Sequence, residues 1–238
     1  MEVNDDLKKL YSDYYHDEKV IMKRKVAARQ TLDHLNSILP RRNYHSIIDV
    51  GAGDGSVLEE IEKANIGEVL HAVEISESGC ACIKEKNLAK LQSVNQFDGY
   101  KIPGNHLEFE LGIAIHVLEH VEHERAFILE MARTCEYLYI EVPLELTFKV
   151  RRNVQIGAQF GHINYYNGVT FQNLLKSCGL EVLEYRAFST SPDYENLLGG
   201  RFKGGMKHGL RSVALNMFPN IAPWMITYMG GAYCKSQS

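Results

Sequence analysis

The stretch Ser46-Ile47-Ile48-Asp49-Val50-Gly51-Ala52-Gly53-Asp54-Gly55-Ser56 decides the fold of this chain. A short apolar, β-branched run is followed by a turn with three glycines, and then by apolar residues at helical spacing. This order predicts a strand, a tight loop and the start of a helix. Glycines let the backbone adopt positive φ and approach a ligand closely. Because the N–H groups at a helix start favour hydrogen-bond-accepting groups, the stretch is a candidate cofactor loop.

Two common phosphate-binding motifs do not fit this loop. The dinucleotide fingerprint G-x-G-x-x-G would need a glycine at Ser56, and a P-loop would need a lysine after its last glycine. The loop instead resembles the first motif of the class I S-adenosylmethionine (SAM)-dependent methyltransferases, in which an acidic residue precedes a G-x-G-x-G turn. The resemblance implies SAM as cofactor, S-adenosyl-L-homocysteine as product, and cofactor contacts from Asp49, Gly51, Ala52 and Gly53. An ordinary glycine-rich turn is the alternative for this segment alone.

A second apolar run, residues 69–76, contains Glu74 about 20 residues past Gly53. An acidic side chain at the end of a second strand can accept hydrogen bonds from both hydroxyls of a ribose. A solvated glutamate is the alternative for this residue alone, but the glycine turn at this spacing favours the cofactor role. The resemblance adds Ile75, which follows it, to the cofactor contacts.

A third strand is predicted over residues 91–97, and Asp98-Gly99 follows it. In the family that the chain resembles, an acidic or polar residue at this place contacts the adenine amino group. Asp98 fits that position, and Gly99 would let the ring approach. Taken alone, an Asp-Gly pair is more often just a turn.

The second specific resemblance is Val117-Leu118-Glu119-His120-Val121, which follows a buried strand over residues 109–115 and enters a helix. It indicates the small-molecule and quinone-biosynthesis-like branch of the family, although Glu110 stands where that pattern has aspartate. We expect His116 to line the cofactor near its methionine part. His120 is a catalytic candidate, with a capping or packing role as the equal alternative.

A third resembling segment, Gly161-His162-Ile163-Asn164-Tyr165-Tyr166, follows a fifth strand over residues 137–143. His162 is the best candidate for a general base or substrate ligand, because histidine exchanges protons near neutral pH. A loop histidine bonded to backbone is the alternative. Tyr165 is a second catalytic candidate, and Asn164 and Tyr166 are candidates for shaping the acceptor pocket.

Strands and helices alternate along the chain, which predicts an α/β fold with a doubly wound, mostly parallel sheet. The resemblance implies seven strands, of which residues 180–190 and 224–235 form an antiparallel pair at the sheet edge. A helix is expected over residues 169–178 between strands five and six. The predicted organisation is an N-terminal helical cover, residues 1–40, and a SAM-binding domain, residues 41–238, with a helical lid insert over 191–223.

The N-terminal cover has two helical patterns, residues 3–18 and 20–39, and Pro40 stops the second. The first contains Tyr11, Tyr14 and Tyr15. Plain amphipathic packing is one interpretation. The other, which the resemblance implies, is a tyrosine-rich lid in which Tyr14 contacts the cofactor.

The insert contains Arg201, Lys203, Lys207, His208 and Arg211 without an acidic residue between them, and glycines near its start that would make it flexible. A solvated basic face is one interpretation. The sharper hypothesis is an anionic acceptor bound by Arg201 and Lys203. Residues Arg151 and Arg152 are expected in another loop.

Composition limits the remaining classes. The chain has 238 residues with a net charge of −4, and its pI near 6.2 argues against a nucleic-acid partner. We expect no membrane span because no apolar run is long enough. An acidic start and five cysteines without a CxxC pair predict a cytoplasmic protein with reduced thiols. A homodimer is left open.

We therefore predict a SAM-dependent methyltransferase of a small molecule, O-directed in preference to N- or C-directed. The Asn/Asp-Pro-Pro-Tyr motif typical of amino-nitrogen base methylation is absent after the fourth strand, which disfavours N6-adenine-type DNA or RNA targets. The acceptor could be an anionic sugar, polyketide or lipid intermediate. The alternatives are a repurposed or non-catalytic SAM-binding partner protein, and a protein or RNA methyltransferase. A metal site of His116, His120 and His123 is conceivable on one helical face, but we expect no metal.

Overall fold

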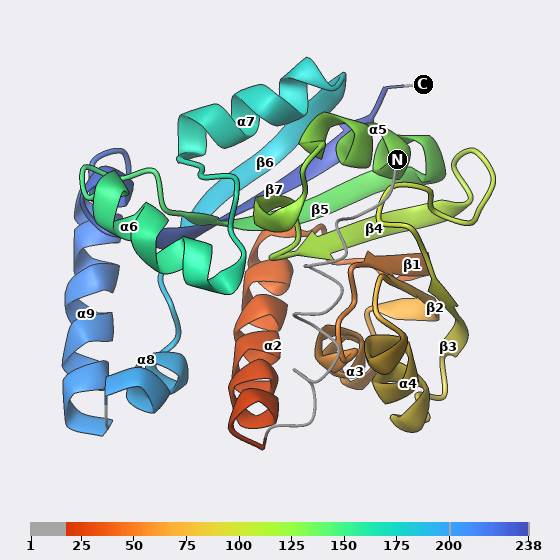
Figure 1. Ribbon diagram of the computed structural model, residues 1–238, viewed down its shortest axis with the longest axis horizontal. Coiled ribbons are helices and arrows are strands. Elements are labelled where there is room, and N and C mark those ends of the chain that lie inside the picture. Colours follow the sequence, from red (N-terminus) through yellow and green to blue (C-terminus); the bar gives the residue numbers. More distant parts are fainter. Residues whose placement is uncertain (1–17, 200, 238) are drawn as a thin grey trace.

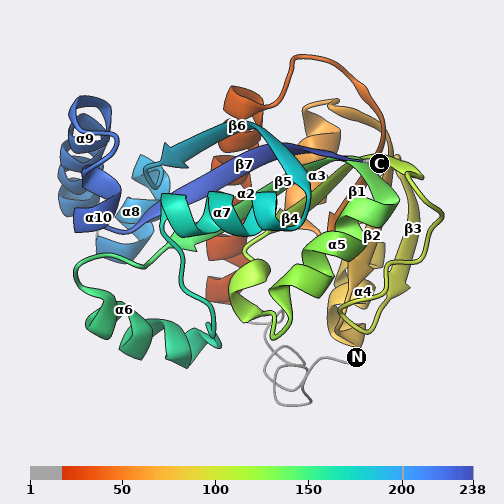
Figure 2. The same cartoon turned by 90° about the horizontal axis from the view of Figure 1, so that it is seen from above.

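The computed structural model describes residues 18–199 and 201–237, with side chains for 21–197 and 204–237. A seven-stranded sheet has the order β3-β2-β1-β4-β5-β7-β6. Strand β7 pairs antiparallel with β5 and β6, and the other neighbours pair parallel. Helices cover both faces of this sheet (Figures 1 and 2). The predicted doubly wound architecture with an antiparallel edge pair is confirmed.

The strands are β1 (Tyr44–Val50), β2 (Gly67–Glu74), β3 (Leu91–Gln96), β4 (Phe109–Ile115), β5 (Cys135–Leu144), β6 (Leu180–Phe188) and β7 (Tyr228–Ser236). The α-helices are α2 (Glu18–Ile38), α3 (Ser56–Lys63), α4 (Glu77–Glu85), α5 (Glu124–Thr134), α6 (Val150–Gly157), α7 (Gly168–Ser177), α8 (Pro192–Gly199), α9 (Arg201–Met217) and α10 (Ala222–Met225). Two 3-10 helices, Leu118–His120 and Ala158–Phe160, complete the described elements.

The sheet separates two apolar cores. On one face, α2, α3 and α4 contribute Leu35, Leu58 and Ile83 to a buried cluster. On the other face, α5 and α7 contribute Phe127 and Phe171 to a second cluster. Burying apolar surface on both faces is what the continuous apolar strands require. The sheet is therefore held rigid, and its strand ends provide a fixed edge for a site.

Helix α2, part of the predicted N-terminal cover, packs into the body of the protein. The His34 ring stacks on Phe188 of β6 with centroids 4.1 Å apart. Its Nδ1 lies 2.9 Å from Glu141 Oε2 of β5. Because these contacts are buried, α2 is fixed relative to the strand ends that it covers.

Three local predictions were wrong. The Val117–Val121 segment forms a single 3-10 turn, and the following helix α5 begins only at Glu124. Arg151 and Arg152 lie in helix α6 and not in a loop. The last strand starts at Tyr228, because the short helix α10, with a proline in its first turn, occupies residues 222–225.

The insert between β6 and β7 is a pair of helices, α8 and α9, followed by α10 (Figure 2). Its glycines, predicted as a flexible start, include Gly204 within helix α9. A Cβ at Gly204 would lie 2.6 Å from the Asn196 backbone nitrogen of α8. The glycine therefore allows the two helices to approach closely. Within the described ranges, no helix has the length and apolarity needed to cross a membrane.

Candidate active site

The glycine turn between β1 and α3 forms one wall of the site. Gly51, Gly53 and Gly55 have φ of 83°, 58° and 74°, in the left-handed region that favours glycine. The N–H of Gly51 donates to the carbonyl of Val73 in β2 at 2.8 Å. A Cβ at Gly51 would lie 2.6 Å from Val117 Cγ2. The turn is thus fitted between the ends of neighbouring strands, and a larger residue has no room there.

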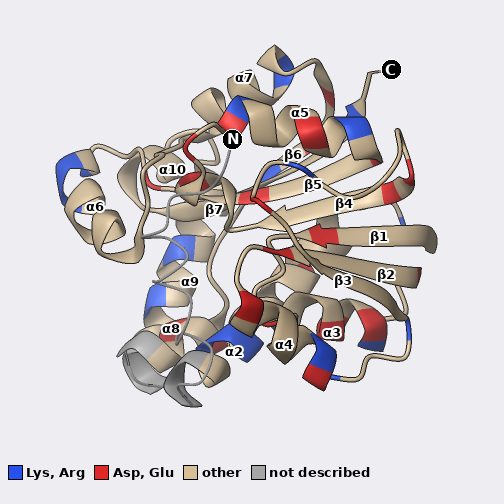
Figure 3. Cartoon of the chain, turned by 45° about the vertical axis from the view of Figure 1, so that its right-hand side comes forward, with Lys and Arg blue, Asp and Glu red and all other residues tan. Residues whose placement is uncertain are grey.

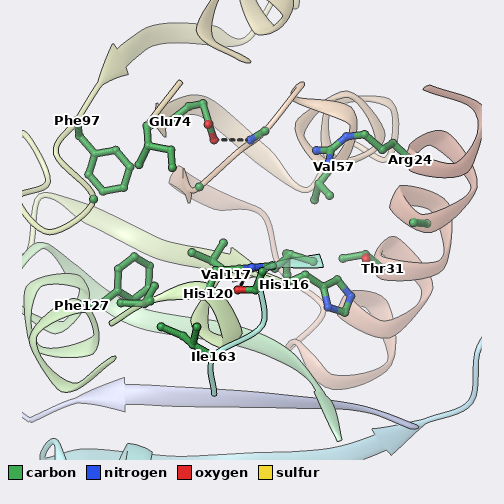
Figure 4. Close-up of a pocket in the computed structure, with 18 of the residues that line it drawn as sticks. Arg24, Thr31, Val57, Glu74, Phe97, His116, Val117, His120, Phe127 and Ile163 are labelled. Atoms are coloured by element: carbon green, nitrogen blue, oxygen red, sulfur yellow. Dashed lines mark hydrogen bonds between the residues drawn. The ribbon is translucent and has the colours of Figure 1, made fainter. Parts of the chain in front are cut away.

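Glu74 ends β2 with its carboxylate buried and lining the same cavity. Its Oε2 accepts from the Gly53 N–H at 2.9 Å, the bond drawn in Figure 4. Its Oε1 accepts from the Ser76 N–H and hydroxyl at 3.0 and 2.9 Å. A carboxylate offers about four acceptor positions. Three are therefore used within the protein, and one on Oε2 is left for a ligand hydroxyl unless the Gly53 bond is exchanged.

Arg24 of α2 is a cavity residue that the sequence analysis did not single out. Its Nε donates to Asp54 Oδ1 at 2.9 Å, and its guanidinium lies against Gly53. Burial alone would raise the pKa of Asp54, but the guanidinium and the Ser56 hydrogen bonds lower it below its usual range. A cation is thereby fixed beside the glycine turn. The only sequence signal was a basic residue in a helix predicted to be a cover.

Asp49, two residues before the turn, is almost completely buried. Burial, with the nearby Glu74 carboxylate, raises the pKa of Asp49 to about 8, although Arg24 acts in the opposite direction. The carboxyl is consequently protonated at neutral pH. A cationic ligand group beside it would favour its ionised form.

The cavity has a volume of about 440 Å³, in the range of small-molecule sites. Figure 4 shows Phe97 and Phe127 at one side, Arg24 and Thr31 at the other, and Glu74 across from His116 and His120. Seven of the predicted site residues line it, namely Gly51, Gly53, Glu74, Ile75, Gly99, His116 and His120. The lining is mostly apolar, so its few polar groups decide the orientation of a ligand.

His116 follows β4 with a φ of 55°, a conformation that non-glycine residues rarely adopt. Its Nδ1 lies 3.4 Å from Glu119 Oε1, and its Nε2 lies 3.4 Å from Glu141 Oε1. Burial alone would lower the pKa of His116, but the two carboxylates raise it to about 10. A charged imidazolium therefore lines the cavity. Strained backbone of this kind is concentrated at functional sites.

Glu119, His120 and His162 form a polar cluster between two segments that lie far apart in the sequence. Ligand atoms of Glu119, His120 and His162 lie within 4.8 Å of one another. The His162 Nδ1 lies 2.8 Å from Glu145 Oε2, and the His120 Nδ1 lies 3.1 Å from the Gly161 carbonyl. The Glu145 carboxylate raises the pKa of His162 against the opposing effect of burial. Burial lowers the pKa of His120, which favours its neutral form.

Seven of the described predicted residues lie outside the cavity lining: Asp49, Ala52 and His162, and four whose side chains bond to nearby backbone. The Asn164 amide donates to the carbonyls of Leu118 and Val121 at 3.1 and 2.6 Å. The Tyr165 hydroxyl donates to the His162 carbonyl at 3.0 Å, and the buried Tyr166 hydroxyl reaches the Leu118 carbonyl at 3.3 Å. Asp98 accepts from the N–H of Tyr100 at 2.9 Å within a turn. These side chains brace the loops around the site.

The remaining predicted residues divide into two groups. Ala52 is buried in the glycine turn behind the cavity lining. Tyr14 lies outside the described residues, and so do the side chains of Arg201 and Lys203. Their proposed contacts with cofactor and acceptor stay predictions.

Comparison with known proteins identifies the class. Residues 22–185 match the family model of a methyltransferase domain. The match covers more than half of the chain, so the chain belongs to this methyltransferase family. It is a class I SAM-dependent methyltransferase: the cofactor is SAM, and the cofactor product is S-adenosyl-L-homocysteine.

Solved structures of the same fold have diverged far in sequence. A chain in the complex between the Haloferax volcanii Trm112 methyltransferase activator and a methyltransferase is 10% identical, with a TM-score of 0.70 over 97% of this chain and 99% of that one. Geranyl diphosphate C-methyltransferase from Streptomyces coelicolor A3(2), in complex with Mg²⁺, geranyl diphosphate and S-adenosyl-L-homocysteine, is 11% identical, with a TM-score of 0.64 over 93% and 85%. The [4+2]-cyclase SpnF is 16% identical, with a TM-score of 0.63 over 88% and 81%. No curated protein matches the chain by sequence.

Proposed function

We propose that the enzyme transfers the SAM methyl group to a hydroxyl oxygen of a small molecule bound at the histidine end of the cavity. The main supporting observation is that His120, which lines the cavity, contacts the ring of His162. The Nδ1 of His162 is hydrogen-bonded to the Glu145 carboxylate. A methyl acceptor with a hydroxyl group must lose a proton, whereas the sulfonium supplies the methyl group without further activation. Acceptor-side polar groups are therefore what an O-methyltransferase needs.

The orientation of His162 supports proton transfer. Since Glu145 accepts the Nδ1–H, the neutral ring carries its lone pair on Nε2. The raised pKa of His162 makes that nitrogen a stronger base. As the C–O bond forms and the S–C bond breaks, the hydroxyl proton leaves the acceptor. The products are the methyl ether, S-adenosyl-L-homocysteine and one proton.

The small-molecule class is supported by the cavity and by the neighbours. A volume of about 440 Å³ suits a cofactor and a compact acceptor better than a polymer. The geranyl diphosphate methyltransferase is a neighbour whose ligand carries a diphosphate. That precedent supports an anionic acceptor, with Arg201 and Lys203 as its proposed partners. A cytoplasmic location, a homodimer and the lack of a nucleic-acid partner stay predictions.

The test has two stages. Calorimetry should detect binding of SAM and of S-adenosyl-L-homocysteine to the purified protein. Labelled SAM should then give a labelled product in a small-molecule pool, and mass spectrometry should place the methyl group on oxygen. Binding without product in any pool would favour the repurposed alternative, for which the cyclase SpnF shows that this fold supports other chemistry. A labelled protein or RNA would favour the macromolecular alternative.

A further inference from the structure

We infer that Glu119, His120 and His162 form a binding site for a divalent transition-metal cation at the acceptor end of the cavity. The metal binding is independent of the reaction, whereas its role in ionising the acceptor rests on the proposed O-methylation. This site differs from the one that the sequence suggested. The His123 ring, at the start of α5, contacts the ring of Tyr100. Among the described residues, His123 does not belong to the cluster of possible metal ligands.

The three ligand atoms already lie close to a common centre. Three atoms within 4.8 Å of one another fit inside a circle of about 2.8 Å radius, so one point is within that distance of all three. Metal–ligand bonds to imidazole nitrogen and carboxylate oxygen are about 2.0–2.2 Å long. Each side chain therefore has to move by less than about 1 Å, which small changes of side-chain torsion supply.

Both histidines have the hydrogen-bond pattern of metal ligands. The His120 Nδ1 faces the Gly161 carbonyl, which can only accept, so the Nδ1 carries the hydrogen. The His162 Nδ1 faces the Glu145 carboxylate in the same way. Each neutral ring thus carries its lone pair on Nε2. Metal-binding histidines almost always donate their other N–H to a carbonyl or carboxylate, as these two do.

Glu119 supplies the independent sign that a ligand belongs here. Its side chain is only 1% exposed, and among the described residues its Oε2 has no hydrogen-bond partner. A buried carboxylate oxygen without a hydrogen-bond partner destabilises the folded state. Glu119 Oε1 lies 3.4 Å from His116 Nδ1, which leaves Oε2 as the open oxygen of the carboxylate. A cation would complete it.

The loops hold the ligands at fixed spacing. The Glu119 carbonyl accepts from the N–H groups of Ile163 and Asn164 at 2.8 and 3.0 Å. The Asn164 amide bonds the carbonyls on either side of the 3-10 turn. The two ligand-bearing segments, 41 residues apart at His120 and Gly161, are therefore joined by five hydrogen bonds to backbone carbonyls.

The donor set indicates the kind of cation. Two imidazoles and one carboxylate favour Mn²⁺, Fe²⁺, Co²⁺ or Zn²⁺ over Mg²⁺ or Ca²⁺, which prefer oxygen. Three protein ligands leave coordination positions open for other molecules. His120 lines the cavity, so the cation would lie beside the space for the acceptor. A bound cation would occupy the His162 Nε2 lone pair, so His162 would then be a ligand and not the base. An acceptor hydroxyl that binds the cation would have its pKa lowered and lose its proton to solvent, and its oxygen would accept the methyl group as the S–C bond breaks.

The experiment uses tag-free protein stripped with a chelator and titrated with Co²⁺. We expect one Co²⁺ per chain by calorimetry and visible absorption bands typical of mixed nitrogen and oxygen ligation. His162→Ala and His120→Ala should each weaken Co²⁺ binding at least tenfold, and Glu145→Gln should weaken it about 10- to 100-fold through His162. His123→Ala removes a nearby histidine outside the cluster and should leave the affinity unchanged.

The outcomes separate this inference from the proposed function. No stoichiometric Co²⁺, Mn²⁺ or Zn²⁺ binding, or binding that His123→Ala weakens as much as His162→Ala, overturns the metal site. Methyl transfer by the chelated protein with unchanged kcat also overturns its catalytic role and leaves His162 as the general base. Calorimetric SAM binding by each variant shows that it is folded. Metal binding without methyl transfer would refute O-methylation and leave the site standing.

Discussion

The turns after β1 and β4 leave neighbouring parallel strands at the same edge of the sheet, yet they treat their polar groups in opposite ways. After β1, the Glu74 carboxylate has three protein donors, and Arg24 is paired with Asp54. After β4, Glu119 Oε2 is buried and has no hydrogen-bond partner in the part of the chain that the structure describes. His116, three residues before it, has strained backbone.

This difference indicates what each part of the cavity binds. We call the part around the glycine turn and Glu74 the cofactor half, and the part around His116, Glu119 and His120 the acceptor half. The cofactor half is satisfied before any ligand arrives, as expected of a rigid site for one invariant molecule. The acceptor half keeps unsatisfied polar atoms, which cost stability and are tolerated where a ligand or an ion completes them. The asymmetry involves the two turns together with Glu74 at the end of β2 and Arg24 of α2. Four predictions test it, from the largest expected effect to the smallest.

Removing the acceptor-side base or ligand should have the largest effect. His162→Ala should lower kcat about 10²- to 10⁴-fold, the usual range for proton-transfer catalysis, and leave the calorimetric affinity for SAM within about twofold. His106→Ala, in an exposed loop far along the chain, is the matched control. A loss of SAM affinity equal to the loss of kcat would show that the two halves are not separable.

Removing the Glu74 carboxylate should weaken cofactor binding. Glu74→Ala leaves the Gly53 and Ser76 N–H groups without their acceptor and removes the ligand position on Oε2. At about 1–3 kcal/mol for an unsatisfied buried group, SAM affinity should fall about 10- to 100-fold in calorimetry. The exposed neighbour Glu77→Ala should bind SAM normally. Wild-type SAM affinity in Glu74→Ala would remove Glu74 from the cofactor site.

Asp49 should give the protein without cofactor a pH-dependent stability. Its folded pKa of about 8 lies above the unfolded value, so the folded state retains a proton that the unfolded chain loses from about pH 4 upward. The contribution of Asp49 to the free energy of unfolding should therefore fall with rising pH up to about pH 8, by at most about 1.4 kcal/mol per unit. In denaturant titrations Asp49→Asn should lose this contribution, so its stability relative to the wild type should rise from about pH 4 to pH 8. The same slope in Asp49→Asn and in the exposed control Asp33→Asn would contradict the assignment.

Charge reversal in the insert should have the smallest effect. Arg201→Glu with Lys203→Glu should raise the acceptor KM several-fold at low salt, with kcat and SAM affinity unchanged, because salt screens the attraction between a cationic side chain and an anionic acceptor. Arg186→Glu, an exposed cation paired with Glu184, is the control. An unchanged acceptor KM would reject the anionic acceptor without touching the metal site or the methyltransferase class.

Much of the fold and of the cofactor half could be predicted because the signals are local. The glycine turn needs positive φ at three positions within five residues, and Glu74 must end the adjacent strand. Both requirements leave residue types at fixed spacing. The helix boundaries after β4 could not be predicted, because a 3-10 turn and an α-helical turn begin with the same short apolar pattern.

The sequence by itself determined the class of this protein: a doubly wound sheet, the glycine turn, the acidic residue after β2 and hence SAM as cofactor. Only the tertiary structure placed the Arg24 guanidinium against Gly53 and brought the ligand atoms of Glu119, His120 and His162 within 4.8 Å of one another. The physical reason is that the first set follows from the backbone demands of single turns, whereas the second depends on helix α2 packing and on hydrogen bonds between segments 41 or more residues apart. Contacts between segments so far apart leave no periodic pattern in the sequence. The residues that they bring together are the ones proposed to carry the chemistry.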